Sequence, residues 1–134
     1  MAISVAKYLG KARVETTHLA SGQKVVTDAV KEYGGQGEYP TPVEVLAQSL
    51  ANCALTVLAL RGMKEGVDIT GSYAEIGECE ENMENHSVSK FNIVFHIKGN
   101  VEEGLRKKLE MFAHKGCFVG NTLTAEKNFT FIYE

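Results

Sequence analysis

Three cysteines are the residues of this chain with the clearest capacity for covalent chemistry. Cys53, Cys79 and Cys117 are widely spaced and form no Cys-x-x-Cys pair. An odd number of scattered cysteines is not the framework of a disulfide-stapled secreted domain. Isolated cysteines in a reducing compartment are mostly inert small hydrophobes, and reactive thiols or metal ligands are the less common uses. The surroundings of each cysteine must therefore separate these roles.

The three cysteines have different sequence surroundings. Cys117 follows a predicted helix at a chain turn, where the N–H groups of a new helical turn would favour its thiolate. Cys53 lies inside an apolar predicted helix, where burial raises a thiol pKa unless a cation or a hydrogen-bond donor reaches it. Cys79 lies among glutamates in the run GECEE, whose carboxylates disfavour a thiolate. Taken alone, Cys53 is most simply an inert core residue, and we interpret Cys79 as a bystander.

Glu44 and the four histidines are the remaining candidates. Glu44 stands three residues after Thr41, which is the spacing of a capping box. It lies about 180° round the helix and roughly 13 Å along it from Cys53, so it can act on that thiol only from another subunit or loop. The histidines show no metal-ligand spacing, and the chain carries no phosphate loop or nucleophile elbow.

Length and composition predict one soluble domain over residues 1–134. A chain of 14.6 kDa with 44% hydrophobic and 23% charged residues can bury a core, and it shows no repeat or low-complexity run. The net charge of -3 and the dispersed basic residues argue against nucleic acid as a partner. Polar residues interrupt the longest apolar stretch, and the N-terminus lacks the apolar core of a signal peptide. We therefore expect a cytoplasmic protein that has no membrane partner.

The first half of the chain is expected to place strands before one long helix. Strand patterns occupy three ranges, Ile3–Tyr8, Arg13–Leu19 and Lys24–Val30. Thr41 and Pro42 predict the start of a helix that runs to about Arg61. The apolar residues of this segment leave no wide polar face, which is typical of a helix buried nearly all round.

The second half is expected to form a hairpin, an amphipathic helix and a last strand. The hairpin strands are predicted over Val67–Glu80 and Val88–Lys98, with an apolar face at Phe91, Ile93, Phe95 and Ile97. Asn100 then precedes a helix over Val101–Lys115, with Glu103 as its capping partner. A helical turn from Cys117 and a strand ending at Tyr133 complete the chain. The order βββ-α-ββ-α-β predicts an α+β fold with a buried central helix.

Two long segments of the chain resemble one protein family. The run GEYPTPVEVLAQSLANCALTVLAL, followed by HKGCFVGNTL, is similar to the OsmC/Ohr family of thiol-dependent peroxidases. The resemblance covers nearly the whole chain. It implies an OsmC-like fold in an intertwined homodimer, in which sheets wrap the central helices and redox sites lie at the subunit interface. It also implies that no metal or organic cofactor is needed.

The resemblance assigns roles to four residues. Cys53 matches the peroxidatic cysteine, whose thiolate attacks a hydroperoxide and becomes a sulfenic acid. Cys117 matches the resolving cysteine, which forms a disulfide with Cys53 that an external dithiol later reopens. Arg13, the only arginine of the N-terminal strand region, matches the activating arginine, and Glu44 matches the glutamate of the family. The implied substrates are hydroperoxides, and we expect organic ones because apolar residues would line the site.

The chain departs from the organic hydroperoxide enzymes of this family at two positions. Those enzymes place a glutamate directly after the helix-leading proline, where this chain has Val43, and Glu44 comes one residue later. Their resolving cysteine is commonly followed by proline, and here Phe118 follows. These departures keep an alternative function open, namely a non-catalytic OsmC-like dimer that binds a small apolar ligand at the subunit interface.

Overall fold

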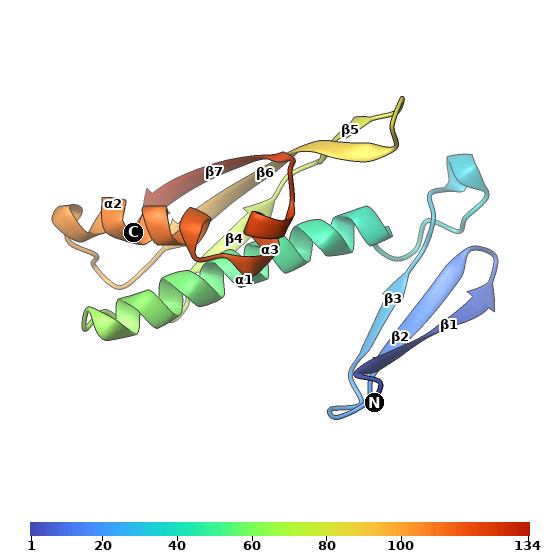
Figure 1. Cartoon of the computed structure of the whole chain (residues 1–134), viewed down its shortest axis with the longest axis horizontal. Helices are drawn as coiled ribbons and strands as arrows, with labels where there is room; N and C mark the ends of the chain where they lie inside the picture. Colours follow the sequence, from blue (N-terminus) through green and yellow to red (C-terminus); the bar gives the residue numbers. More distant parts are fainter. The chain divides into compact units, whose positions relative to one another are not determined.

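The computed structural model describes residues 1–134, which separate into two compact units, Met1–Leu46 and Ala47–Glu134 (Figure 1). In chain order the elements are β1 (Ser4–Gly10), β2 (Arg13–His18), β3 (Lys24–Thr27), the 3-10 helix η1 (Lys31–Tyr33), α1 (Pro42–Lys64), β4 (Tyr73–Ile76), β5 (Glu80–Asn82), β6 (Ser87–Ile97), α2 (Glu103–Lys115), α3 (Phe118–Thr122) and β7 (Glu126–Tyr133). The α+β class is confirmed.

The first unit is an antiparallel sheet of three strands with β2 in the middle. Val14 on β2 lies opposite Tyr8 on one side and Thr27 on the other. The three predicted strands are confirmed, but β3 ends at Thr27 rather than at Val30. The reason is that the N–H of Asp28 donates to the carbonyl of Pro40 (3.0 Å), which takes the chain out of the ladder.

The start of α1 is a capping box, as the sequence predicts. The N–H of Thr41 donates to Oε1 of Glu44 (2.8 Å), and the N–H of Glu44 donates to Oγ1 of Thr41 (3.2 Å). The helix continues past the predicted end at Arg61 to Lys64, and the chain turns where Gly66 takes a φ of +74°.

The buried residues of α1 form one stripe along the helix. They are Ala47, Leu50, Ala51, Ala54, Leu58 and Gly62. Leu60 and Met63 point away from this stripe and are 57% and 71% exposed. Within the single chain, therefore, the predicted burial of the central helix is met on one side only. By length and composition α1 would also be able to cross a membrane, a weak criterion that core helices of soluble proteins satisfy as well.

The second unit is built round β6. This strand pairs antiparallel with β4 and β5 and parallel with β7. Its apolar face is buried as predicted, since Phe91, Ile93, Phe95 and Ile97 are at most 1% exposed. Phe95 stacks on Phe131 and meets Phe129 edge to face, both at 5.1 Å between ring centroids.

Two predicted boundaries in this unit are wrong. The expected strand over Val67–Glu80 is a loop followed by the short strands β4 and β5. Asp68 begins that loop by accepting from the N–H and the hydroxyl of Thr70. The chain leaves β6 again after Gly77, whose N–H still donates to the carbonyl of Asn92 at 2.8 Å. The helix expected from Val101 begins at Glu103 and has no side-chain cap, so Glu103 is not a capping partner.

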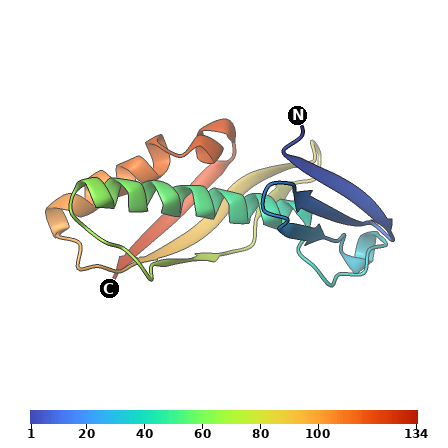
Figure 2. The ribbon, with the colours of Figure 1, turned by 90° about the horizontal axis from the view of Figure 1, so that it is seen from below.

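Helix α2 runs beside α1 in the opposite direction (Figure 2). Nζ of Lys108 lies 2.7 Å from the carboxylate of Glu65, and the guanidinium of Arg61 lies over the ring of Phe112. Near the other end of α2, a side chain at Gly116 would lie only 3.1 Å from Cγ1 of Val57. This close approach brings the end of α2, and α3 after it, against the middle of α1.

Candidate active site

The two cysteines expected to react lie together in the second unit. Cys53 is in the middle of α1, and Cys117 stands between α2 and α3. The two thiols are close enough for Cys53 to raise the pKa of Cys117, and both cysteines are free. The antiparallel packing of α1 and α2 produces this contact, because it brings residues 64 positions apart to the same level of the helix pair.

Cys117 is the N-terminal cap of α3. Its Sγ accepts from the N–H of Gly120 at 3.2 Å, so the sulfur takes the place of the hydroxyl or carboxylate oxygen usual at this position. The helical turn expected after Cys117 is thus confirmed, and the thiol itself fixes it.

The two thiols differ in their environments. Cys117 is fully buried, whereas Cys53 is only partly buried. Burial raises the pKa of Cys117, and the hydrogen bond with Cys53 raises it further, while the N–H groups of Gly120 and Val119 lower it. The net effect keeps Cys117 protonated.

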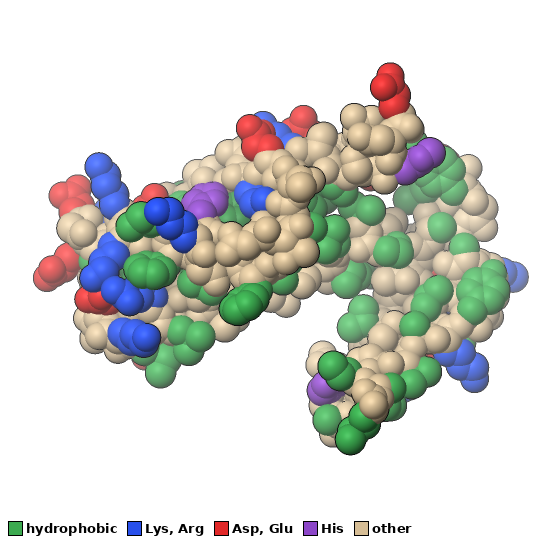
Figure 3. Space-filling view, in the orientation of Figure 1, with side chains coloured by type: hydrophobic (Ala, Val, Ile, Leu, Met, Phe, Trp, Pro, Cys, Tyr) green, Lys and Arg blue, Asp and Glu red, His purple; other side chains and the backbone are tan.

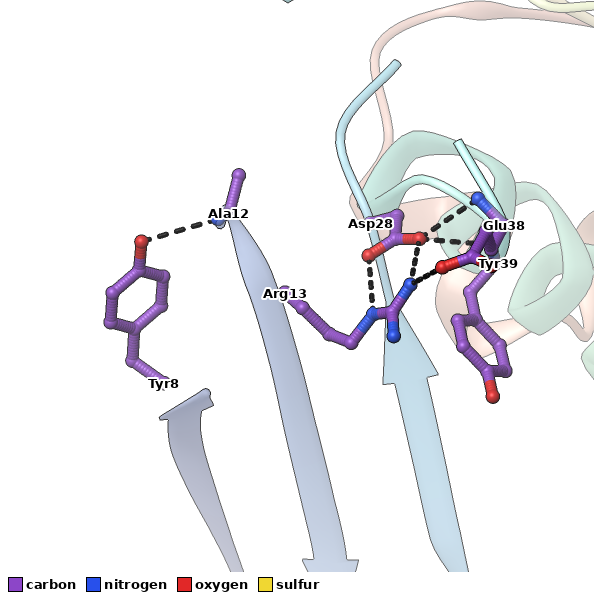
Figure 4. A network of polar contacts seen from close by, with 6 residues as sticks. All are labelled: Tyr8, Ala12, Arg13, Asp28, Glu38 and Tyr39. Atoms are coloured by element: carbon purple, nitrogen blue, oxygen red, sulfur yellow. Dashed lines mark hydrogen bonds and ion pairs between the residues drawn. The ribbon is translucent and has the colours of Figure 1, made fainter. Parts of the chain in front are cut away.

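Arg13 belongs to the first unit, where three residues hold its side chain (Figure 4). Its Nε and Nη2 donate to the two carboxylate oxygens of Asp28, at 2.8 and 2.9 Å, and Nη2 also donates to Glu38 at 2.5 Å. The guanidinium lies 4.7 Å from the ring centroid of Tyr39. Arg13 is thereby fixed in position and only partly exposed.

Asp28 is the functional candidate that sequence reasoning missed. It is 1% exposed, and beyond Arg13 its carboxylate accepts from the N–H groups of Glu38 and Tyr39, at 2.9 and 3.1 Å. These contacts, led by the hydrogen bonds from Arg13, lower the pKa of Asp28 to about 2 and raise that of Arg13. The available signal was a lone acidic residue directly after the strand that pairs with the strand of Arg13.

Glu44 is the fourth predicted site residue, and its observed contact is the capping box. One carboxylate oxygen accepts from Thr41, on the first turn of α1. The structure therefore brings Cys53 and Cys117 together, places Arg13 in an ion-pair network of the first unit, and gives Glu44 a structural contact at the start of α1.

The remaining cysteine and two of the histidines have other surroundings. His114, three residues before Cys117, stacks on the ring of Phe129 at 4.6 Å between centroids. Cys79 stands between β4 and β5. His96 lies between the carboxylates of Glu75 and Glu134, at 2.5 and 3.0 Å, and these raise its pKa. No group of three or more histidine, cysteine or acidic side chains is arranged to hold a metal ion.

A family model described as OsmC-like protein matches residues 35–131. The chain belongs to the OsmC-like family. The matched range includes Glu44, Cys53 and Cys117, and Arg13 precedes it. No curated protein matches the chain in sequence.

Solved structures of OsmC-like proteins share the fold. One is a protein of Psychrobacter arcticus 273-4 assigned to the osmotic stress induced and detoxification response, with 27% identity and a TM-score of 0.89 over 100% of this chain and 96% of that one. An OsmC like protein from Mycoplasma pneumoniae has 17% identity and a TM-score of 0.76 over 96% and 95% of the two chains. The organic hydroperoxide resistance protein OhrB of Bacillus subtilis has 16% identity and a TM-score of 0.63 over 100% and 98%.

Proposed function

We propose that this OsmC-like protein is a thiol-dependent peroxidase that reduces organic hydroperoxides in the cytoplasm. The observation that carries the proposal is the close pairing of a partly exposed Cys53 with a buried Cys117. The organic hydroperoxide resistance named for the Bacillus subtilis protein of the same fold supports this substrate class.

The proposed chemistry uses the two thiols in sequence. The Cys53 thiolate attacks one oxygen of the hydroperoxide, the O–O bond breaks, and the other oxygen leaves as an alkoxide that takes a proton to become the alcohol. Cys53 is then a sulfenic acid. The sulfur of Cys117 displaces its hydroxyl group as water, and the disulfide forms. An external dithiol returns both cysteines to thiols and is itself oxidised to a disulfide.

The order of the two cysteines follows from their environments. A buried, protonated Cys117 is poorly suited to attack a peroxide, because the thiolate is the nucleophile. Its S–H can instead donate to Cys53 and so stabilise a negative charge there. Cys117 is also adjacent when the sulfenic acid forms, which shortens the lifetime of that oxidised species.

Arg13 and Glu44 complete the proposed catalytic set, and we propose that the chain acts as a homodimer. Arg13 would favour the Cys53 thiolate and the developing alkoxide by its positive charge. Asp28 would act on it as a positioning residue through the hydrogen bonds at 2.8 and 2.9 Å. The dimer is supported by apolar side chains that the single chain leaves exposed over α1 and over the β1–β3 sheet (Figure 3).

The test is turnover of cumene hydroperoxide with dithiothreitol as the dithiol. We expect Cys53→Ser to lose activity by roughly a hundredfold or more, because it lacks the nucleophile. Without dithiothreitol, which would reduce a sulfenic acid, Cys117→Ser should consume one equivalent of peroxide per chain and leave a sulfenic acid that dimedone traps. Cys79→Ser is the matched control and should turn over as wild type does. A wild-type rate no higher than that of Cys53→Ser would refute the proposal.

A further inference from the structure

Arg13 shares its single positive charge between two carboxylates. Its Nε and Nη2 donate to the two oxygens of Asp28, and Nη2 also donates to Oε1 of Glu38 at 2.5 Å. Neither carboxylate has a second cationic side chain as a partner within the chain. The three side chains therefore carry one positive and two negative charges, and the cluster as a whole is negative.

The two carboxylates contribute differently to the position of Arg13. Asp28 is buried, binds the guanidinium through both oxygens, and accepts from the main-chain N–H groups of Glu38 and Tyr39. The Glu38 side chain makes one contact, to a nitrogen that Asp28 already engages. The orientation of Arg13 thus follows from Asp28 and from the backbone of residues 38 and 39. What the Glu38 side chain adds is mainly its charge.

We propose that the Glu38 carboxylate, held beside Arg13, offsets the positive charge that Arg13 brings to the Cys53 thiolate and so restrains the reactivity of this cysteine. The inference rests on the proposed function, which assigns Arg13 to that thiolate. A nearby positive charge favours a thiolate and a nearby negative charge disfavours it. Glu38 acts by its charge and does not touch the reacting atoms.

The guanidinium keeps one nitrogen for an anion. Nη1 of Arg13 has no partner among the residues of this cluster, whereas Nε and Nη2 are both engaged (Figure 4). An anion at Nη1 would lie nearer to the guanidinium than to the carboxylate on Nη2. Coulomb interactions weaken with distance, so Glu38 reduces the attraction of such an anion without abolishing it.

The substitution Glu38→Gln removes the charge and retains the geometry. The amide oxygen of Gln can accept from Nη2, and the main-chain N–H that donates to Asp28 is unchanged. The Cys53 thiolate is followed by its ultraviolet absorbance during a pH titration of the full chain with Cys79→Ser. The titration of Cys53→Ser is subtracted, and no reagent has to reach the thiol. We expect Glu38→Gln to lower the pH midpoint by roughly half a unit, which is about threefold more thiolate below the midpoint.

Three variants show whether the charge of Glu38 beside Arg13 is the cause. Glu38→Asp keeps the charge and should titrate closer to wild type than Glu38→Gln does. Glu15→Gln removes a carboxylate of the same sheet that pairs with Lys24, and its midpoint should equal that of wild type. In an Arg13→Gln background the carboxylate of Glu38 is no longer held, so the effect of Glu38→Gln should become smaller.

Three results would overturn the inference. They are an unchanged or higher midpoint in Glu38→Gln, an equal shift in Glu15→Gln, and an undiminished effect of Glu38→Gln without Arg13. Failure of the proposed peroxidase function is a separate result, because it is measured as turnover of cumene hydroperoxide. A chain that is inactive on peroxide but shows the expected shift would keep the inference about Glu38 and lose the proposed reaction.

Discussion

Asp28 has a buried carboxylate that accepts two hydrogen bonds from Arg13 and two from main-chain amides. Its pKa in the folded chain, about 2, lies below the ordinary value of 3.8. A carboxyl group with a lowered folded pKa stabilises the fold above the unfolded pKa. That contribution is lost as the pH falls from about 4 towards 2.

The substitution Asp28→Asn tests this network. We expect a lower melting temperature at pH 7, because Asn cannot pair with the Arg13 guanidinium. The difference from wild type should shrink between pH 4 and pH 2, where the wild-type carboxylate is itself protonated. Circular dichroism melts from pH 2 to pH 7 measure both effects.

A matched control is Glu15→Gln, which removes an exposed ion pair with Lys24. Its effect should stay within about 0.5 kcal/mol at any pH, since surface pairs contribute little. If Asp28→Asn had the same melting temperature as wild type at pH 7, or if the difference in melting temperature did not change with pH, the ion pair of Asp28 and Arg13 would not stabilise the fold.

The residue scale also shows where sequence reasoning ends. Cys53 and Cys117 were identified from the family resemblance, and their contact depends on how α2 packs against α1, at Gly116 and Val57. Asp28 escaped notice because nothing local marks it. Its partners Arg13 and Glu38 are 15 and 10 residues away. Pairing of β2 with β3 brings Arg13 to it, and the loop before α1 brings Glu38 back through the bond from the N–H of Asp28 to the carbonyl of Pro40.

At the scale of elements, the sequence predicted correctly those features that depend on residues within one helix or strand. The alternating pattern of β6 and the capping box of α1 are confirmed because each depends on residues within one segment. The start of α2 and the extent of β4 were wrong. Helix formation there follows from packing rather than a cap, and the β4 segment turns at Asp68 and Gly77 despite its strand-like composition.

Glu44 has two roles to distinguish, the observed helix cap and the proposed catalytic charge, and substitutions in the capping box can distinguish them. Thr41→Ala removes the acceptor for the N–H of Glu44 and should lower the free energy of unfolding by about 1 kcal/mol. Glu44→Gln keeps an oxygen that can accept from the N–H of Thr41, so its stability should stay within about 0.5 kcal/mol of wild type. Urea unfolding followed by circular dichroism measures both.

Activity of the same Glu44→Gln protein then isolates the charge. With the cap intact, slower turnover of cumene hydroperoxide would support the proposed catalytic role. Unchanged turnover would show that Glu44 serves only as a helix cap. Greater destabilisation by Glu44→Gln than by Thr41→Ala would contradict the capping interpretation itself.

At the scale of the whole molecule, the exposed apolar side chains of α1 require an explanation. Leu60 and Met63 are 57% and 71% exposed, and Leu55, Ala59 and Met63 line a groove of about 210 Å³ with the segment 68–72. Fully burying one such side chain is worth about 1.5–3 kcal/mol. A second copy of the chain would recover this free energy, and obligate dimers are the class of interface with the most apolar composition.

Light scattering on the purified chain tests the dimer. We expect a mass of about 29 kDa, twice the 14.6 kDa of one chain. Met63→Glu should shift the mass towards that of one chain, because the dimer would have to bury an unpaired carboxylate. Met83→Glu is the control, since Met83 is 57% exposed in the polar turn between β5 and β6, and it should leave the mass unchanged.

The alternatives give different masses. A wild-type mass of 14.6 kDa at micromolar concentration would exclude the homodimer, and the exposed groove on α1 would then be a surface of the monomer. Loss of the dimer in both methionine variants would point to a general effect of added charge rather than an interface at α1. Loss in Met63→Glu alone would place α1 in the interface, because the two variants carry the same change in net charge and differ only in position.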